Sequence, residues 1–203
     1  EASDCPNTWG CNFSGGDLHG IIEKIEEGYF DNLGINMLYL NPVFLSPSNH
    51  KYDTADYLMI DPLFGEMSTF ELLIEKAHEH DIKVMLDGVF NHTSSDSPYF
   101  DRYSRYQEDG ACESAQSEYR DWYTFVDGPP NTCADESGST TKHYVHWFIF
   151  DSLPKLNFMN NAVIEFFLYV GEFWGGKGID GWRFDVGDNI DPGLTHDPEN
   201  HFW

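Results

Sequence analysis

The sequence predicts an α/β protein built on a parallel sheet, and three observations support this prediction. Segments with apolar residues at helical spacing alternate with short apolar runs typical of buried strands. Two of these runs lead into carboxylates, Asp87 and Asp185, at the position where a parallel α/β barrel exposes catalytic groups. The sequence contains neither a G-x-G-x-x-G turn nor a P-loop, so a closed barrel is favoured over an open nucleotide-binding sheet.

The predicted elements are, in chain order, a helix over 18–25, a strand over 35–40, a helix over 68–77, a strand over 82–86, a helix over 162–174 and a strand over 179–185. The first helix spaces its apolar residues at three and four, and it follows Asp17, an acid that can cap it. The first strand begins after Gly34, which suits the end of a helical region, and stops before Pro42.

The second and third helix–strand pairs repeat this pattern. The second helix carries Ser68 and Glu71 at the spacing of a capping box, and the apolar strand after it leads into Asp87. A later, strongly apolar helix leads into the strand that ends at Asp185. This regular alternation of helices and apolar strands indicates a parallel sheet that is covered by its helices.

A long insertion interrupts the pattern between residues 93 and 157. This segment is rich in Ser, Asp, Gly, Pro and aromatic residues and is too long for an ordinary connection. We interpret it as an irregular lobe over the mouth of the barrel. The chain is therefore expected to divide into a barrel segment over 1–92, the inserted lobe over 93–157 and a second barrel segment over 158–203.

The composition restricts the partners. The chain has 35 acidic and 11 basic residues, which give a formal charge of −24 at pH 7. Such a charge repels nucleic acids and anionic membrane surfaces, so we expect no nucleic-acid partner and no membrane partner. An acidic surface that keeps the protein soluble accounts for the charge itself. No apolar run approaches the ~20 residues that span a bilayer, and no targeting segment is recognisable.

The cysteines bear on the compartment. None of the four belongs to a C-x-x-C pattern, so a zinc site is not expected. Cys5 with Cys11 and Cys112 with Cys133 would form local disulfides in an oxidising compartment, and free thiols are an equally open alternative, because spacing alone does not establish the geometry. We expect an extracellular or periplasmic location, with the cytoplasm as the alternative.

Side chains that could act in catalysis or binding lie in the two segments that contain Asp87 and Asp185. Asp87, Asn91 and His92 lie within one turn of a strand end and can project into a polar cleft. Arg183 and Asp185 alternate along a strand, which places them on one face, and a nearby guanidinium keeps a carboxylate nucleophile ionised. Taken singly, each group also has a structural explanation, as a helix cap, a surface histidine or an ion pair.

Five stretches resemble, in order, the signatures of the α-amylase family, glycoside hydrolase family 13. They are Gly34 to Pro42, His50 to Tyr57, Asp87 to His92, Leu153 to Asn157, and Gly181 to Asp185. The strings HKYDTADY and LPKLN resemble the branch that contains neopullulanases, cyclomaltodextrinases and maltogenic amylases. The resemblance implies a partial TIM (β/α)8 barrel that covers the second to fourth β/α units, with the irregular lobe inserted after the third strand.

The resemblance also implies the roles of five side chains. Asp185 resembles the nucleophile that forms a glycosyl-enzyme intermediate, and Arg183 would hold it charged. Asp87 and His92 resemble the residues that bind sugar hydroxyls at the cleavage site, and Tyr52 resembles the aromatic platform under that sugar. These roles fit the chemistry, because the C–H face of a sugar stacks on an aromatic ring and its hydroxyls need charged partners in place of water.

Calcium is the cofactor that the resemblance implies, in a structural role. Gly15 and Asp17 match part of an N-terminal calcium loop, and Asn91 resembles a second calcium ligand. Oxygen atoms on loops are the ligands that calcium prefers. Capping of the first helix by Asp17 is an equally open alternative.

The expected function is that of a fragment of an α-retaining glycosidase. Its substrates would be α-glucans such as starch, pullulan, cyclodextrins and maltooligosaccharides, cleaved by double displacement. This mechanism needs a nucleophile and an acid/base carboxyl group. The family places that acid, a glutamate, after its fifth strand, so we expect it beyond Trp203 and expect the isolated chain to be inactive. A non-catalytic carbohydrate-binding or interaction protein is the alternative, and the oligomeric state is left open.

Overall fold

The structure, a computed structural model, describes residues 15–128 and 131–187. These residues form two units, and each is described by itself. The first contains 15–52, 57–88 and 169–184, and the second contains 53–56, 89–128, 131–168 and 185–187. In the described part of the chain, no helix is both long enough and apolar enough to cross a membrane.

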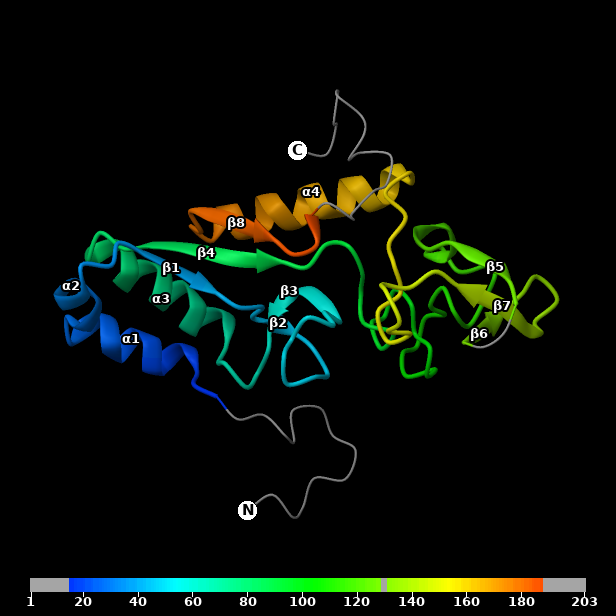
Figure 1. Ribbon diagram of the computed structural model, residues 1–203, viewed down its shortest axis with the longest axis horizontal. Coiled ribbons are helices and arrows are strands. Elements are labelled where there is room, and N and C mark those ends of the chain that lie inside the picture. The colour runs from blue at the N-terminus through cyan, green and yellow to red at the C-terminus, as the bar shows by residue number, and fades with distance from the viewer. Residues whose placement is uncertain (1–14, 129–130, 188–203) are drawn as a thin grey trace, which may run out of the picture. The chain divides into compact units, whose positions relative to one another are not determined.

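A parallel sheet of three strands lies at the centre of the first unit. Its strands are β1 (Met37–Leu40), β4 (Lys83–Gly88) and β8 (Gly181–Phe184), and they pair in the order β1-β4-β8. Figure 1 shows the three arrows running in the same direction. The predicted parallel sheet is confirmed. Since β4 continues to Gly88, Asp87 lies within the strand rather than just after it.

Helices α1 (Leu18–Glu26) and α3 (Met67–Glu79) belong to the same unit (Figure 1). Asp17 caps α1, because its Oδ1 accepts a hydrogen bond of 2.8 Å from the backbone N–H of Gly20. The apolar residues of α1 recur at helical spacing and lie on its buried face, namely Leu18, Ile22 and Ile25. The predicted first helix and its cap are therefore confirmed.

The capping box predicted for α3 is wrong by two residues. The cap is Glu66, whose side chain accepts from the backbone of Thr69, while the side chain of Thr69 bonds the backbone of Glu66. Ser68 is already inside the first turn, because the helix begins at Met67. A glutamate is an uncommon cap, which explains why Ser68 was the more obvious choice.

A short helix, α2 (Tyr29–Leu33), precedes β1 and is not predicted from the sequence. Gly28 and Gly34 flank it with φ of 70° and 69°, in the left-handed region that favours glycine. The N–H of Gly34 closes the helix by bonding to the carbonyl of Asp31 at 3.0 Å. Gly34 thus ends a helical region as predicted, but that region consists of two helices.

A small two-stranded sheet was also missed. It is formed by β2 (Phe44–Leu45) and β3 (Asp56–Ile60), which flank the loop that carries Tyr52. The sequence of this region is rich in Ser, Asn and Asp and gives only a weak strand signal.

Trp174 organises the core of the first unit. It lies on α4 (Asn161–Gly176), is fully buried, and donates its indole N–H to the carbonyl of Tyr57 at 2.8 Å. The rings of Phe44 and Phe70 have centroids 5.0 and 5.1 Å from that of Trp174. This aromatic cluster joins α3, α4 and β2 in the core of the first unit.

The lobe within the second unit is more regular than predicted. It contains a three-stranded antiparallel sheet in the order β5-β7-β6, formed by β5 (Phe125–Asp127), β6 (Thr132–Ala134) and β7 (Thr140–Tyr144), and a 3-10 turn over Arg120–Trp122. The strands are short and carry several polar residues, so their apolar alternation is too weak to be recognised from the sequence.

A disulfide joins Cys112 to Cys133 across 21 residues, with the Cα atoms 4.6 Å apart. The backbone N–H of Ala134 also donates to the carbonyl of Cys112 at 2.9 Å. Of the two local pairs considered from the sequence, this one is therefore formed. Cys5 and Cys11 lie outside the described residues.

Candidate active site

Asp87 is the centre of the candidate active site. It is the penultimate residue of β4, the middle strand of the parallel sheet, and only 1% of its surface is exposed. A buried carboxylate needs charge or hydrogen-bond donors in exchange for the water it has lost. Three side chains from three segments of the first unit provide them.

Arg183 provides the charge. The parallel pairing of β4 with β8 sets Asp87 opposite Arg183. The Nη1 atom of Arg183 lies 3.0 Å from both Oδ1 and Oδ2 of Asp87 and donates to both. The guanidinium is partly exposed while the carboxylate is fully enclosed, so the positive charge lies on the solvent side of the pair.

Two tyrosines provide the remaining donors. The phenol of Tyr52 donates to Oδ2 of Asp87 at 3.0 Å, and the phenol of Tyr39 donates to the same oxygen. Burial, followed by the hydrogen bond to Asp87, raises the pKa of Tyr39. Burial likewise raises the pKa of Tyr52. Both phenols therefore remain protonated donors throughout the neutral range.

Tyr39 is a site residue that the sequence reasoning missed. It belongs to β1, the neighbour of β4, and lies near the carboxyl end of that strand. Since the carboxyl ends of parallel strands share one edge of a sheet, its place in the strand was a usable signal. Tyr39 was expected only as part of the strand over 35–40.

This arrangement can bind a sugar. An ionised carboxylate held by a guanidinium accepts hydrogen bonds from vicinal hydroxyls, and a half-buried tyrosine offers a ring face for C–H stacking. Asp87, Arg183 and Tyr52 were predicted as substrate-binding residues, and the structure brings these three together. Their contact with a substrate stays a prediction.

Asn91 and His92 lie in the second unit and are both buried. The Nδ2 atom of Asn91 is 3.0 Å from Nδ1 of His92, and the imidazole stacks on Trp147 with ring centroids 5.9 Å apart. Trp147 thus fixes the plane of the imidazole, whose role toward a substrate stays a prediction.

Two of the sequence signatures pair with each other in this unit. His92 and Lys155 form an antiparallel bridge, and the N–H of Leu156 donates to the carbonyl of Asn91 at 3.0 Å. The N–H of Thr93 bonds the carbonyl of Pro154 at 3.2 Å. The LPKLN segment therefore pairs through backbone hydrogen bonds with the segment that carries His92.

Asp185, the predicted nucleophile, is half-buried and directly follows Phe184, the last residue of β8. The strand was predicted to include Asp185, but it ends one residue earlier, and Asp185 begins a turn. The sequence argument that Arg183 and Asp185 alternate along one strand is therefore incorrect. That Arg183 keeps Asp185 ionised stays a prediction.

Of the three residues predicted to bind calcium, one has a side-chain oxygen that is available as a ligand. Oδ1 of Asn91 is buried and has no hydrogen-bond partner within the described structure, as an oxygen awaiting a cation would be. Asp17 uses Oδ1 to cap α1, and Gly15 is exposed beside it. Among the described residues, no group of three or more His, Cys, Asp or Glu side chains is placed to hold a metal. Calcium stays a prediction.

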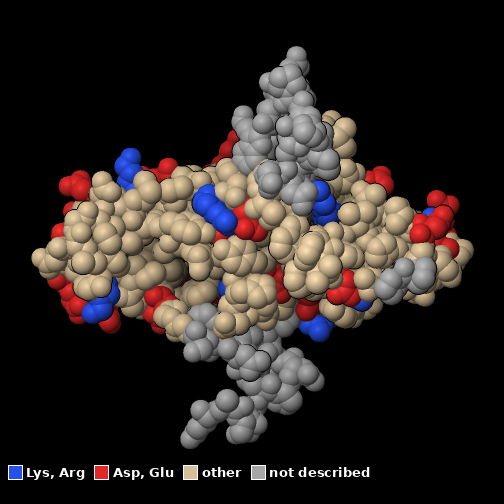
Figure 2. All heavy atoms as spheres, viewed as in Figure 1, with Lys and Arg blue, Asp and Glu red and all other residues tan. Residues whose placement is uncertain are grey.

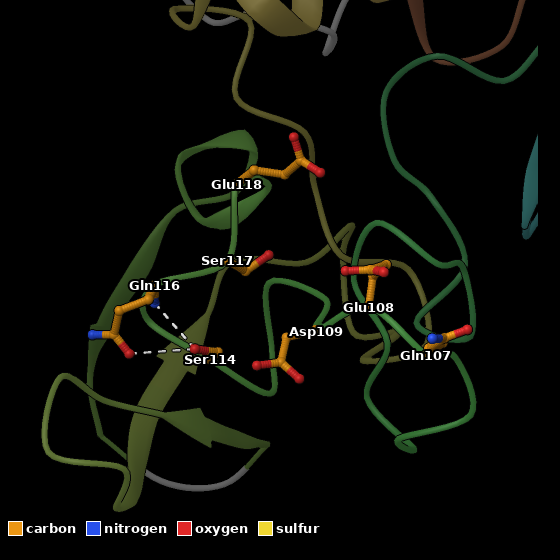
Figure 3. A pocket seen from close by; sticks show the side chains of 7 residues that line it. All are labelled: Gln107, Glu108, Asp109, Ser114, Gln116, Ser117 and Glu118. Carbon is orange, nitrogen blue, oxygen red and sulfur yellow. Dashed lines mark hydrogen bonds between the residues drawn. The ribbon is translucent and has the colours of Figure 1, made fainter.

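A polar hollow of about 360 Å³ lies in the second unit, and none of the residues around Asp87 lines it. Figure 3 shows its side chains, which are acidic or neutral and polar, namely Gln107, Glu108, Asp109, Ser114, Gln116, Ser117 and Glu118. The hydrogen bonds drawn there join Ser114 to Gln116 within the loop. The hollow is open and lacks an aromatic face, so it offers no platform for a sugar.

The basic side chains on the visible face are scattered rather than gathered into a patch (Figure 2). The whole sequence has 11 basic and 35 acidic residues. The absence of a nucleic-acid partner stays a prediction.

Comparison with known proteins gives one family. Residues 2–201 match the family described as Alpha amylase, catalytic domain. An amylopullulanase of Thermoanaerobacter thermohydrosulfuricus is 41% identical over 219 residues, which cover 96% of this chain and 14% of that protein. Neopullulanase 2 of Thermoactinomyces vulgaris is 41% identical over 180 residues, which cover 89% of this chain and 28% of that protein. The chain thus spans less than a third of the length of these relatives.

Solved structures agree with this match. The cyclic α-maltosyl-(1→6)-maltose hydrolase from Arthrobacter globiformis superimposes with a TM-score of 0.75 at 36% identity, covering 89% of this chain and 38% of that one. The Nostoc punctiforme debranching enzyme gives a TM-score of 0.74 at 38% identity, with 90% of this chain and 35% of that one covered.

Proposed function

Because this chain belongs to the α-amylase catalytic-domain family, we propose that the protein carrying it is a retaining glycoside hydrolase that cleaves α-glucosidic bonds. Its substrates are α-glucans, such as pullulan, cyclodextrins, starch and maltooligosaccharides. The chain contributes part of the catalytic barrel and most of one sugar-binding subsite. The observation that supports this most directly is the convergence of Arg183, Tyr52 and Tyr39 on the buried carboxylate of Asp87.

We assign the roles as follows. Asp185 attacks the anomeric carbon of the substrate and forms a covalent glycosyl ester, while the bond to the leaving sugar breaks. Asp87 and His92 hold hydroxyls of the sugar at the cleavage site. Tyr52 stacks under that sugar, and Arg183 holds the nucleophile Asp185 charged. A protonated carboxyl group must deliver a proton to the leaving oxygen, and we assign no residue of this chain to that role.

The test is to trap the intermediate. A fluorinated glucosyl fluoride, which slows hydrolysis of the glycosyl ester, is added to the full-length protein, and peptides are analysed by mass spectrometry. We expect the label on Asp185 and expect Asp185→Asn to abolish both labelling and release of reducing ends from pullulan. Glu172→Gln, on the exposed face of α4, is the matched control and should keep activity.

Two outcomes would contradict the proposal. A label on another carboxylate would refute the role of Asp185 as nucleophile, but it would not refute the proposed glycosidase activity. The non-catalytic alternative would instead be supported if the full-length wild-type protein bound maltooligosaccharides without cleaving them. The Asp185→Asn variant would then behave in the same way.

We further propose a structural calcium ion that takes Oδ1 of Asn91 as one ligand, and an exported protein. The first proposal is supported by the buried and unpartnered Oδ1, and the second by the Cys112–Cys133 disulfide, since disulfides persist in oxidising compartments. Chelation should lower the melting temperature of the full-length protein, and calcium should restore it less well in Asn91→Leu. Equal restoration in both proteins would exclude Asn91 as a ligand.

A further inference from the structure

Lys51 and Asp61 form a buried ion pair in the first unit. The Nζ atom of Lys51 lies 2.6 Å from Oδ2 of Asp61, and only 2% and 4% of their side chains are exposed. The same ammonium donates to the carbonyl of Ser46 at 3.0 Å and lies 5.9 Å from the centroid of the Phe64 ring. Burial of two charges is costly unless their hydrogen-bonding capacity is used, and here it is.

The carboxylate of Asp61 fastens the loop that follows β2. Asp61 is the first residue after β3, and its Oδ1 accepts from the N–H of Leu63 at 3.0 Å, which orients the group. Its Oδ2 accepts from the N–H of Ser46 at 3.1 Å, at the start of the loop, and from Lys51 near the end of the loop. One carboxylate therefore holds both ends of the segment 46–51.

Lys51 has a strained backbone. Its φ is 66°, in the left-handed region that residues with a Cβ rarely adopt. Such a conformation persists where the surroundings dictate it, and here the ion pair and the bond from its N–H to Oγ of Ser48, at 3.2 Å, do so. The left-handed residue turns the chain immediately before Tyr52, whose phenol reaches Asp87 at 3.0 Å.

We infer that the Lys51–Asp61 pair is a positioning device for Tyr52. By holding Lys51 in the left-handed conformation, the pair sets the phenol of Tyr52 against Asp87 and the ring where a sugar would stack. Packing alone does not require these charges, because a well-packed apolar pair is often as stabilising as a buried ion pair. The inference rests on the proposed function, since it concerns the sugar platform of that site.

The experiment is a double-mutant cycle in the full-length protein between Lys51→Met/Asp61→Asn and Tyr52→Ala. Removing both partners avoids leaving one charge buried and alone. We expect kcat/KM on maltooligosaccharides to fall by ~10- to 100-fold in the Tyr52 background, because a displacement of about 1 Å at a site has this effect. In the Tyr52→Ala background the same change should alter kcat/KM by no more than about twofold.

An equal fall in both backgrounds would overturn the inference, since a purely structural pair acts whether or not Tyr52 is present. Lys177→Met/Glu71→Gln is the matched control, because it removes an exposed ion pair of 2.5 Å between Lys177 and Glu71. It should leave kcat/KM unchanged. If the double variant does not fold, Lys51→Arg replaces it in the double-mutant cycle. This variant keeps the charge and changes the length of the side chain, and the same two outcomes support or overturn the inference.

A crystal structure of the variant decides the inference without relying on activity. The distance from the Tyr52 hydroxyl to Oδ2 of Asp87 should increase from 3.0 Å to beyond hydrogen-bonding range. An unchanged distance would overturn the inference even if the proposed function holds. If the wild-type protein cleaves no α-glucan, the proposed function fails, and the measured distance still decides whether the pair positions Tyr52.

Discussion

Asp87 on β4 and Arg183 on β8 are register partners in neighbouring parallel strands, and one guanidinium nitrogen donates to both oxygens of the carboxylate at 3.0 Å. The backbone pairing itself therefore brings the two charges together. The phenols of Tyr39 and Tyr52 complete the set of donors around Oδ2. The guanidinium and the two phenols thereby replace the water that the buried carboxylate of Asp87 has lost.

Arg183→Lys should lower kcat/KM of the full-length protein by at least ~10-fold, because lysine lacks the planar donor group and places its charge elsewhere. The effect is measured by initial rates on maltooligosaccharides. Arg102→Lys is the matched control, since Arg102 forms an ion pair with Asp151 in the lobe and should tolerate the change. Equal rates for wild-type protein and Arg183→Lys would show that the Arg183–Asp87 geometry is not needed.

Tyr39→Phe removes one donor from Asp87 and should lower kcat/KM by ~10- to 100-fold, the effect of one hydrogen bond to a charged group. Tyr29→Phe, at an exposed tyrosine, should have no effect on kcat/KM.

Because the folded state raises the pKa of Tyr39, its contribution to stability is present below pH ~10 and is lost as the pH rises further. The stability difference between wild-type protein and Tyr39→Phe should therefore narrow in alkali, as urea titrations would measure. A constant difference up to pH 11 would contradict this.

The parallel sheet was predictable because its strands are short apolar runs between segments with apolar residues at helical spacing. The prediction missed β2, β3 and the lobe sheet, where short strands are set among polar residues and are held by tertiary contacts rather than by local preference. The Glu66 cap was missed for a similar reason, since Ser68 is the stronger local signal and the start of α3 is fixed by a reciprocal bond with Thr69.

The site was predictable where a residue lies in a recognisable motif, as Asp87, Arg183 and Tyr52 do. Tyr39 was missed, because its place near the carboxyl end of a strand is a weak signal and its contact with Asp87 depends on the register of β1 against β4. The same holds for the Lys51–Asp61 pair, whose members lie ten residues apart and meet only through the β2–β3 loop.

Asp180 and Val84 join β4 to the approach to β8, and this junction should contribute to stability. The N–H of Val84 donates to Oδ2 of Asp180 at 2.8 Å, and the N–H of Asp180 donates to the carbonyl of Val84 at 2.8 Å. Burial acts to raise the pKa of Asp180, but the bonds from His78 and from Val84 outweigh it, so the pKa is lowered. A lowered pKa contributes stability above the ordinary aspartate range, and this contribution is lost as the pH falls through the folded-state pKa.

Asp180→Asn should therefore lower the free energy of unfolding by ~1 kcal/mol at pH 7, with a smaller loss at pH 3. Urea titrations at the two pH values measure this difference. Asp81→Asn, an exposed aspartate that precedes β4, is the matched control and should cost little at either pH. A loss of equal size at pH 3 and pH 7 would exclude the charged form of Asp180 as its cause.

The Cys112–Cys133 disulfide should stabilise the lobe in particular. It closes a loop over 21 residues of separation, for which the chain-entropy estimate is ~3 kcal/mol. In a full-length protein with Cys5 and Cys11 changed to serine, dithiothreitol should lower the protection of amide hydrogens in β6 and β7 from exchange, while β4 keeps its protection. In the same background, Cys112→Ser/Cys133→Ser should lower the protection of β6 and β7 as much as dithiothreitol does. Adding dithiothreitol to this variant should cause no further change. Equal loss of protection in β4 and β7 would mean that the disulfide supports the whole fold rather than the lobe.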